Sequence, residues 1–279
     1  MEVIIMKKSW LTVLLIHSAY FLPATAFVAE VSQPETAPDM GASADTRFFE
    51  LGPTPTNLGA SACICALSAY VWRGQVLDNR AVIQPQVELT KFGFFVNAWG
   101  NMNLTDHVTG RRGFSEIDLA AGYDLPLKPV SVRAGVIDYS FPNTSCAETR
   151  EAFTIIQYPN SILTPRFEGY YDFGQANGAY LRLALEHEIA ILEKLRLTPG
   201  FSSGFGTSAY NDYYFAADDS AFNDGNAYAS LVYRLLDDLT LNLSATYVWL
   251  WDRDIRAGAE NIYFNTKQWV LGAMLSYAL

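Results

Sequence analysis

The sequence predicts an all-β fold, a transmembrane antiparallel up-and-down β-barrel of twelve strands. Three observations lead to this fold: long segments alternate apolar and polar residues, short and long connections alternate, and charges fall on one face of the predicted strands. Each is typical of a barrel whose outer face contacts lipid and whose inner face contacts water.

The stretch VIQPQVELTKFGFFVNAWGNMNL shows the alternation most clearly. Its first arm places Val87 and Leu89 on one face and Gln86 and Glu88 on the other, and a second arm follows the turn KFG. Strands in soluble proteins usually run about five or six residues, whereas a tilted membrane strand needs about 9 to 11. Both arms have the longer length, which favours a membrane barrel.

The same pattern recurs down the chain and predicts twelve strands, at residues 67–76, 81–90, 93–104, 115–124, 129–140, 150–158, 164–173, 178–189, 195–206, 226–235, 238–249 and 267–279. An even number is expected of a single-chain bacterial barrel. Connections after strands 2, 4, 6, 8 and 10 are short, and those after strands 3, 5, 9 and 11 are longer. Short connections after strands 1 and 7 depart from this rule. A β-bulge near Val136 and Ile137 would switch the faces of the fifth strand.

Charged residues test the assignment of faces, because a charge facing the bilayer midplane costs about 2 to 4 kcal/mol. When each strand is phased by its Leu, Ile, Val and Phe residues, Asp138 and His187 fall on the outer face, near strand ends. Thirteen charged residues fall on the inner face and are predicted to line a pore: Arg73, Glu88, Glu116, Asp118, Arg133, Arg166, Glu168, Asp172, Arg182, Glu186, Glu188, Arg196 and Arg234.

The N-terminus predicts export. Lys7 and Lys8 precede an apolar stretch and a small-residue site ending at Ala26, so residues 1–26 are predicted to be a cleaved signal peptide, with Met6 as an alternative start. A retained membrane anchor is the alternative. Residues 27–65 lack a sustained period and are predicted to be a flexible periplasmic leader or plug, and residues 66–279 the barrel.

Several motifs bear on catalysis and metal binding. The pattern G-x-S-x-G occurs around Ser202, but it lies inside a predicted strand, whereas a nucleophile elbow needs a sharp strand-to-helix turn. Cys63, Cys65 and Cys146 leave one cysteine over in any monomeric pairing, and the first two are too close on a strand to pair easily. We therefore predict no enzymatic activity, no cofactor and no metal site at these residues.

An acidic loop provides one weak candidate for Ca²⁺. Asp218, Asp219 and Asp224, beside Asn223, give carboxylates at high density, but their spacing departs from the EF-hand pattern. A solvated acidic loop is the default interpretation. The formal net charge of −10 argues against nucleic acid as a partner.

The segments SAYVWRGQVLDNRAVIQPQVEL, NAWGN and the final LSYAL resemble poorly characterised bacterial outer-membrane porins of the TorF-like type, over residues 66–279. The resemblance implies a barrel in the outer membrane of a Gram-negative-type bacterium and, more loosely, a pore. It transfers no catalytic residue. Tyr277 stands third from the end, as in many such proteins, but Leu279 replaces the usual terminal aromatic residue.

These observations predict a narrow passive channel for ions or small hydrophilic solutes, with outer-membrane lipid around it. The inward charges nearly balance, so they favour no charge sign of the solute. They could instead pair across a narrow barrel and close it, since twelve strands enclose less than 16 to 18. A closed structural or adhesive barrel that binds a partner through loops 207–225 and 250–266 is therefore the alternative, and a soluble β-rich secreted protein is a further one. The sequence leaves the solute and the oligomeric state open.

Overall fold

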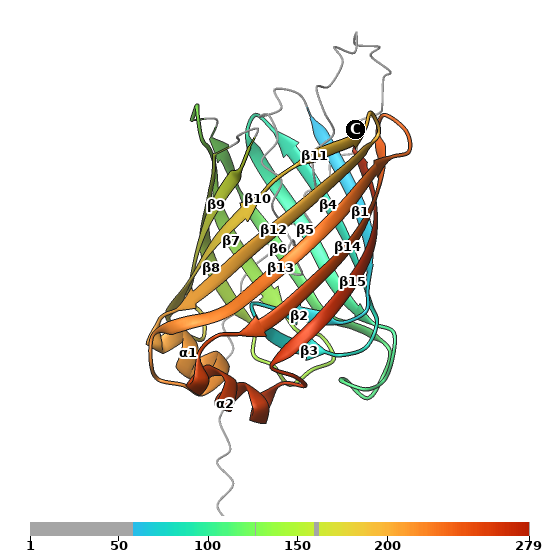
Figure 1. The fold of residues 1–279 in the computed structure, drawn as a ribbon. Helices are drawn as coiled ribbons and strands as arrows, with labels where there is room; N and C mark the ends of the chain where they lie inside the picture. Colours follow the sequence, from blue (N-terminus) through green and yellow to red (C-terminus); the bar gives the residue numbers. More distant parts are fainter. Residues whose placement is uncertain (1–57, 126, 159–161, 279) are drawn as a thin grey trace, which may run out of the picture. The chain divides into compact units, whose positions relative to one another are not determined.

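Twelve antiparallel strands close into a barrel in the computed structural model, which describes residues 58–125, 127–158 and 162–278 (Figure 1). The barrel strands are β1 (Gly59–Leu67), β4 (Val82–Lys91), β5 (Phe94–Asn103), β6 (Gly113–Leu125), β7 (Ser131–Ser140), β8 (Thr149–Gln157), β9 (Thr164–Asp172), β10 (Gly178–Glu186), β12 (Leu195–Gly206), β13 (Ala221–Arg234), β14 (Leu239–Leu250) and β15 (Lys267–Ala278). Each pairs with its neighbour in this order, β1 pairs with β15, and β10 pairs with β12. Short β11 (Ile189–Leu192) continues the line of β10 along β12.

Eleven of the predicted strands lie where the alternation placed them, and the first does not. The predicted strand 67–76 is wrong, because the first barrel strand is β1, which starts at Gly59. The predicted boundary between leader and barrel at residue 66 is therefore wrong as well. The predicted signal peptide at 1–26 and the leader up to residue 57 lie outside the described residues.

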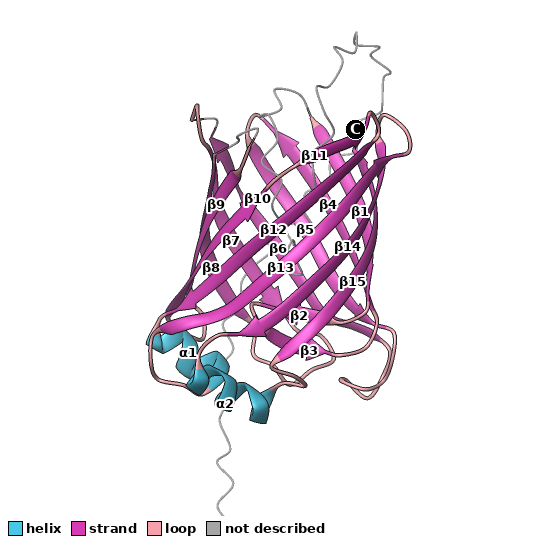
Figure 2. Cartoon of the chain, viewed as in Figure 1, coloured by secondary structure: helices cyan, strands magenta, loops and turns pink. Residues whose placement is uncertain are grey.

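The connections differ between the two ends of the barrel. At one end, here called the turn end, β1 begins, β15 ends, and β4 and β5 are joined by two residues, Phe92 and Gly93. At the other, the loop end, lie the longer connections, among them two helices, α1 (Ser208–Phe215) and α2 (Arg253–Ile262) (Figure 2). No helix in the described part of the chain is long and apolar enough to cross a membrane.

The two faces of the wall have opposite chemistry. Large apolar side chains such as Val87, Leu183 and Leu271 are exposed on the outer face, together with Trp269 and Tyr171 near strand ends. The buried polar residues lie on the other face. An apolar outer band with aromatic residues toward its edges is what a barrel in hydrocarbon requires.

The hypothesis of a β-bulge in the fifth predicted strand is wrong. The strand β7 pairs with β6 and β8 without a register shift at Val136 and Ile137. Val136 is exposed, whereas Ile137 is buried together with Arg133 and Tyr139, so apolar Ile137 belongs to the inner face. Because apolar as well as charged side chains face inward, part of the barrel interior is filled by packed side chains.

The connection between β1 and β4 contains a small hairpin, β2 (Tyr70–Trp72) and β3 (Gln75–Asp78). Arg73 and Gly74 form its two-residue turn, with φ of 48° and 83°. Two positive φ values are those of a type I′ turn, which matches the twist of a tight hairpin. This segment was predicted to be part of the first strand, and its removal from the wall makes the first connection long, as the loop rule expects.

Candidate functional site

The hairpin β2–β3 folds into the interior of the barrel near its loop end, and it is the candidate functional site (Figure 1). All three residues of β2 are buried, as is Arg73 at the tip. A side chain at Gly74 would collide with Leu250 and Asp224, so the turn lies directly against the wall formed by β13 and β14. Arg73 is therefore inside the barrel, but on a hairpin and not on a strand of the wall, which corrects the predicted placement.

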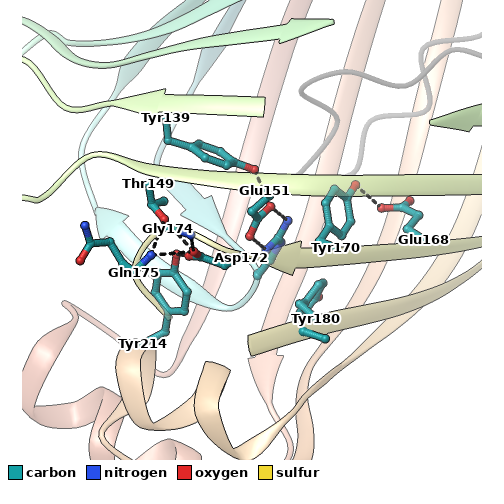
Figure 3. Close-up of polar contacts among 12 residues, drawn as sticks. Tyr139, Thr149, Glu151, Glu168, Tyr170, Asp172, Gly174, Gln175, Tyr180 and Tyr214 are labelled. Atoms are coloured by element: carbon teal, nitrogen blue, oxygen red, sulfur yellow. Dashed lines mark hydrogen bonds and ion pairs between the residues drawn. The ribbon is translucent and has the colours of Figure 1, made fainter. Parts of the chain in front are cut away.

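A buried ion pair fastens the hairpin tip to the opposite wall. Arg73 Nη1 and Nη2 donate to the two carboxylate oxygens of Glu151 on β8, at 2.7 and 2.8 Å, and the Tyr139 hydroxyl donates to the same carboxylate at 2.8 Å. Figure 3 shows Tyr139 and Glu151 in this arrangement. The guanidinium also lies 4.1 Å from the ring centre of Tyr170 and 4.6 Å from that of Tyr180. Bidentate pairing plus ring contacts satisfies the charge of an arginine that water does not reach.

Aromatic residues join the hairpin to the helices at the loop end. The Trp72 ring meets Tyr214 of α1 edge-on at 5.2 Å, and the Tyr263 hydroxyl beside α2 donates to Gln75 Oε1 at 2.6 Å. Burial raises the pKa of Tyr210 and of Tyr214, so both phenols stay protonated at ordinary pH. The hairpin, α1 and α2 thus form one packed cap at this end.

The short β9–β10 connection is tied to the same cap through Asp172. Its carboxylate accepts hydrogen bonds from Thr149 Oγ1, from the Tyr214 hydroxyl, and from the backbone amides of Gly174 and Gln175, at 2.8 to 2.9 Å (Figure 3). Asp172 therefore holds a loop in place, so its predicted role in lining a pore is not supported by its contacts.

A second ion cluster lies on β4, β6 and β7, toward the turn end. Arg133 pairs with Asp124 at 2.7 Å and with Glu88 at 3.0 Å, and its guanidinium lies 4.2 Å from the centre of the Phe95 ring. The strands β4 and β7 are not neighbours, so Arg133 spans the interior surface across β5 and β6.

A third cluster lies on β9 and β10. Arg166 approaches the Glu168 carboxylate to 2.8 Å and Arg182 to 3.8 Å, and the Tyr170 hydroxyl donates to it at 2.9 Å (Figure 3 shows Tyr170 and Glu168). All four side chains are buried. Two arginines therefore share the Glu168 carboxylate, and Glu186 and Asp224 add further negative charge beside Arg166 and Arg182.

Three more predicted residues are inside the barrel. Glu116 accepts from the hairpin residue Tyr70 at 2.7 Å, and Glu186 accepts from Tyr228 at 2.7 Å. Asp118 is completely buried on β6.

The remaining predicted residues lie toward the turn end. Arg196 and Arg234 are half-buried on inward positions of β12 and β13. Glu188 is exposed between β10 and β11 and lies 3.5 Å from Arg196. The predicted place of Glu188 on the inner wall is wrong, because β10 ends at Glu186 and Glu188 lies beyond the strand.

Sequence reasoning did not assign Glu151, Asp124 and Asp224 to the inner face, and it considered Asp224 only as a Ca²⁺ ligand. Phasing by apolar residues failed for β8, since Phe153 and Ile155 face inward with Glu151 and are buried. The sequence did contain a signal for the hairpin: an Arg-Gly pair in the middle of a supposed membrane strand, where glycine is unfavourable and typical of a turn.

The Ca²⁺ candidate does not form. Asp218 and Asp219 are exposed in the loop after α1, whereas Asp224 is buried in β13 and accepts from Tyr180 and Asn226, each at 2.8 Å. Within residues 58–278, apart from the four undescribed positions, no group of three or more His, Cys, Asp or Glu side chains is arranged to hold a metal. The three aspartates were close in sequence, but a strand boundary separates them.

The wall opposite these clusters is uncharged. Inward positions of β14, β15 and β1 carry no charged residue. Hydroxyl, amide, thiol and thioether groups lie there beside apolar side chains, the polar ones including Thr240, Asn242, Thr246, Met274, Ser276, Cys63 and Cys65 and the apolar ones Leu67, Val248, Leu250 and Val270. The neighbouring strands β4 and β5 add amides, of which Gln84 donates to Asn101 at 2.9 Å. Thus both sides of the interior carry polar groups among apolar ones, but the ion pairs occupy one side.

Comparison with known proteins places this architecture in a family. A family model described as "Bacterial protein of unknown function (Gcw_chp)" matches residues 53–193, which is 141 of the 279 residues. The chain belongs to the Gcw_chp family. The match covers the hairpin and every strand from β1 to β11. No curated protein matches.

Solved structures with a similar barrel include the NanC porin, at 12% identity and a TM-score of 0.50 over 78% of this chain and 100% of that chain. The KdgM porin is similar at 10% identity and a TM-score of 0.48, over 78% of this chain and 98% of that chain. OmpT, an outer membrane protein of Vibrio cholerae, has 8% identity and a TM-score of 0.38, over 80% and 97% of the two chains. At these identities the likeness bears on the fold alone.

Proposed function

We propose that this Gcw_chp protein is a porin-like channel in the outer membrane of a Gram-negative-type bacterium, through which ions or small hydrophilic solutes diffuse passively. One observation carries the proposal: a closed barrel with an apolar outside and a polar inside holds a hairpin, β2–β3, within its interior. A channel needs a polar path through the bilayer, and a hairpin folded into that path limits its width. The TorF-like resemblance of the sequence points the same way.

The charges of the interior support a channel with weak ion preference. Arginines at positions 73, 133 and 166 each lie against a carboxylate, at 2.7 to 2.8 Å. Paired charges present little net field to a passing ion. Solutes would then pass along the uncharged wall of β14, β15 and β1 toward the turn end, where hydroxyls and amides can replace part of their hydration shell, and they would meet the hairpin where Val71 and Val76 pack against this wall.

Single-channel recording in planar bilayers tests the proposal. Folded wild-type protein should give steady unitary conductance steps, and a variant in which a short Gly-Ser link replaces residues 70–77 should give larger steps, because the hairpin no longer narrows the interior. A matched control shortens the exposed loop 105–112, which should leave the conductance unchanged. Heat-dependent mobility on gels confirms that each barrel is folded.

A silent wild-type barrel would contradict the channel and favour the second candidate, a closed barrel that binds a partner through its external loops. The packed cap supports that candidate, since Trp72, Tyr214 and Tyr263 tie α1 and α2 to the hairpin. If only the shortened hairpin variant conducts, the cap closes the barrel and the passive channel is wrong.

A further inference from the structure

Three sulfur-bearing side chains lie together on the uncharged wall. Cys63 and Cys65 occupy successive inward positions of β1, and Ile64 between them is 51% exposed on the outer face. Met274 of β15 is the direct cross-strand partner of Cys65. All three sulfur side chains are half-buried, so they border the interior without being sealed in the wall.

The spacing of the two cysteines disfavours a disulfide between them. Residues two apart on one face of a strand are about 6.6 Å apart, whereas a disulfide needs Cβ atoms about 3.5 to 4.5 Å apart. An ion bound by two sulfurs at about 2.3 Å each keeps them at most about 4.6 Å apart, a span that the Cys63 and Cys65 side chains reach by leaning toward each other. Met274, whose Cβ is about 4.5 to 5.5 Å from that of Cys65, can supply a third sulfur.

The surroundings of the three sulfurs are neutral. The other cross-strand partners of the cysteines are Gln84, Gln86 and Ser276, and Cys63 Sγ lies 4.0 Å from Gln86 Oε1. The nearest inward carboxylate on β4, that of Glu88, is paired with Arg133. Hard ions such as Ca²⁺ and Mg²⁺ are usually held by carboxylates, and the inward positions of β14, β15 and β1 carry none, whereas thiolate and thioether ligands select soft ions.

We propose that Cys63, Cys65 and Met274 form a binding site for a soft monovalent cation of the Cu(I) or Ag(I) type, facing the barrel interior. Binding exchanges the thiol protons for the metal ion and releases them to water, with no change in oxidation state. The site rests on the barrel fold and the strand register and is independent of whether the barrel conducts.

The experiment is an anaerobic Cu(I) titration of the detergent-solubilised full chain against a coloured Cu(I) chelator. The reference protein carries Cys146→Ser, which removes the exposed thiol in the β7–β8 loop. It should bind one equivalent of Cu(I). Cys63→Ser or Cys65→Ser should weaken binding by more than about a hundredfold, since each removes a ligand, and loss of even an outer-shell partner costs roughly 10- to 100-fold.

The thioether has a matched control on the outer face. Met274→Leu should weaken Cu(I) binding about tenfold, whereas Met102→Leu, which changes an outward methionine of β5, should have no effect. Equal effects of the two substitutions would overturn the role of Met274. Cu(I) binding that persists unchanged in both serine variants would overturn the site.

A second measurement does not depend on the folding of the serine variants. In the reference protein, one equivalent of Cu(I) should protect both Cys63 and Cys65 from alkylation, read by mass spectrometry of the peptides. Protection of neither thiol, with Cu(I) still bound, would show that the ion binds adventitiously elsewhere and would reject the proposal.

Discussion

Two ion pairs, made by successive residues of β8, allow the inner and outer faces of the wall to be compared. Arg150 points outward and pairs with Asp138 at 2.6 Å, with side chains 61% and 41% exposed. Glu151 points inward and pairs with Arg73 at 2.7 Å, with side chains 0% and 2% exposed. The pairs have the same chemistry and nearly the same length, and they differ in what surrounds them.

This difference shows that the distance between two charged groups does not by itself determine how much their ion pair contributes to stability. The outer pair keeps most of its hydration, so breaking it returns two charges to solvent at little cost. The inner pair is enclosed by Tyr139, Tyr170 and Tyr180, so removing one partner leaves the other charge buried. Substitutions on the inner face should therefore lower the free energy of unfolding strongly, and those on the outer face should change it little.

The largest effect is expected from Glu151→Ala. It leaves the Arg73 guanidinium buried without its carboxylate, which should lower the free energy of unfolding by about 3 to 5 kcal/mol. Urea unfolding of the barrel in lipid vesicles, followed by tryptophan fluorescence, measures the change. The matched control is Glu148→Ala, at an exposed position just before the same strand.

The double variant Arg73→Ala/Glu151→Ala makes that test specific. It removes both charges, so it should recover part of the stability that Glu151→Ala loses. A double variant less stable than Glu151→Ala by the full cost of Arg73→Ala would show that the two side chains do not interact, and the hairpin would then need another anchor.

A smaller effect is expected from added volume on the inner face. In Gly204→Ala, the new methyl group would collide with the Tyr180 hydroxyl and the Asp224 carboxylate, which are hydrogen-bonded to each other. Overpacking of this kind should cost about 1 to 3 kcal/mol in unfolding free energy. Gly169→Ala is the outer-face control, because the nearest atom to its methyl group, Leu181 Cδ2, is at an ordinary 3.5 Å.

The same urea titration separates these two glycine variants. Equal stability of Gly204→Ala and wild type would show that the interior accommodates an added methyl group. The prediction that substitutions on the inner face are strongly destabilising would then be wrong.

The wall of the barrel was predictable because each strand must satisfy one rule along its whole length. Apolar side chains face outward and polar ones inward, so the alternation located eleven strands, and the low tolerance of lipid for charge located most inward charges. The rule constrains the outer face only: it disfavours charges that face the hydrocarbon, but it permits apolar residues on the inner face. Phe153 and Ile155 are apolar residues of this kind on the inner face, and they reversed the inferred phase of β8.

The interior was less predictable because its contacts join residues far apart in the sequence. The separation between Arg73 and Glu151 is 78 residues, and that between Gln75 and Tyr263 is 188. Periodicity is a local property and holds no information on which inward side chains meet. Nearly every residue of the hairpin is buried, so it lacks the alternation of a membrane strand, and the Arg-Gly turn marks residues 70–78 as a hairpin.

The smallest effect is expected at the outer pair, and there the comparison can be made most quantitative. Asp138→Asn and Arg150→Gln should each change the unfolding free energy by less than about 1 kcal/mol, and a double-mutant cycle should give a coupling of about 0 to 1 kcal/mol that falls as salt is added. The corresponding cycle through Arg73 and Glu151 should give a larger coupling that salt hardly changes, since counterions do not reach the interior. An outer coupling as large as the inner one would mean that the outer pair lies in a medium as poor in water as the barrel interior. Asp138 and Arg150 would then sit deeper in the hydrocarbon than their position near the loop end of β7 and β8 implies, and the limits of the apolar band would have to be redrawn.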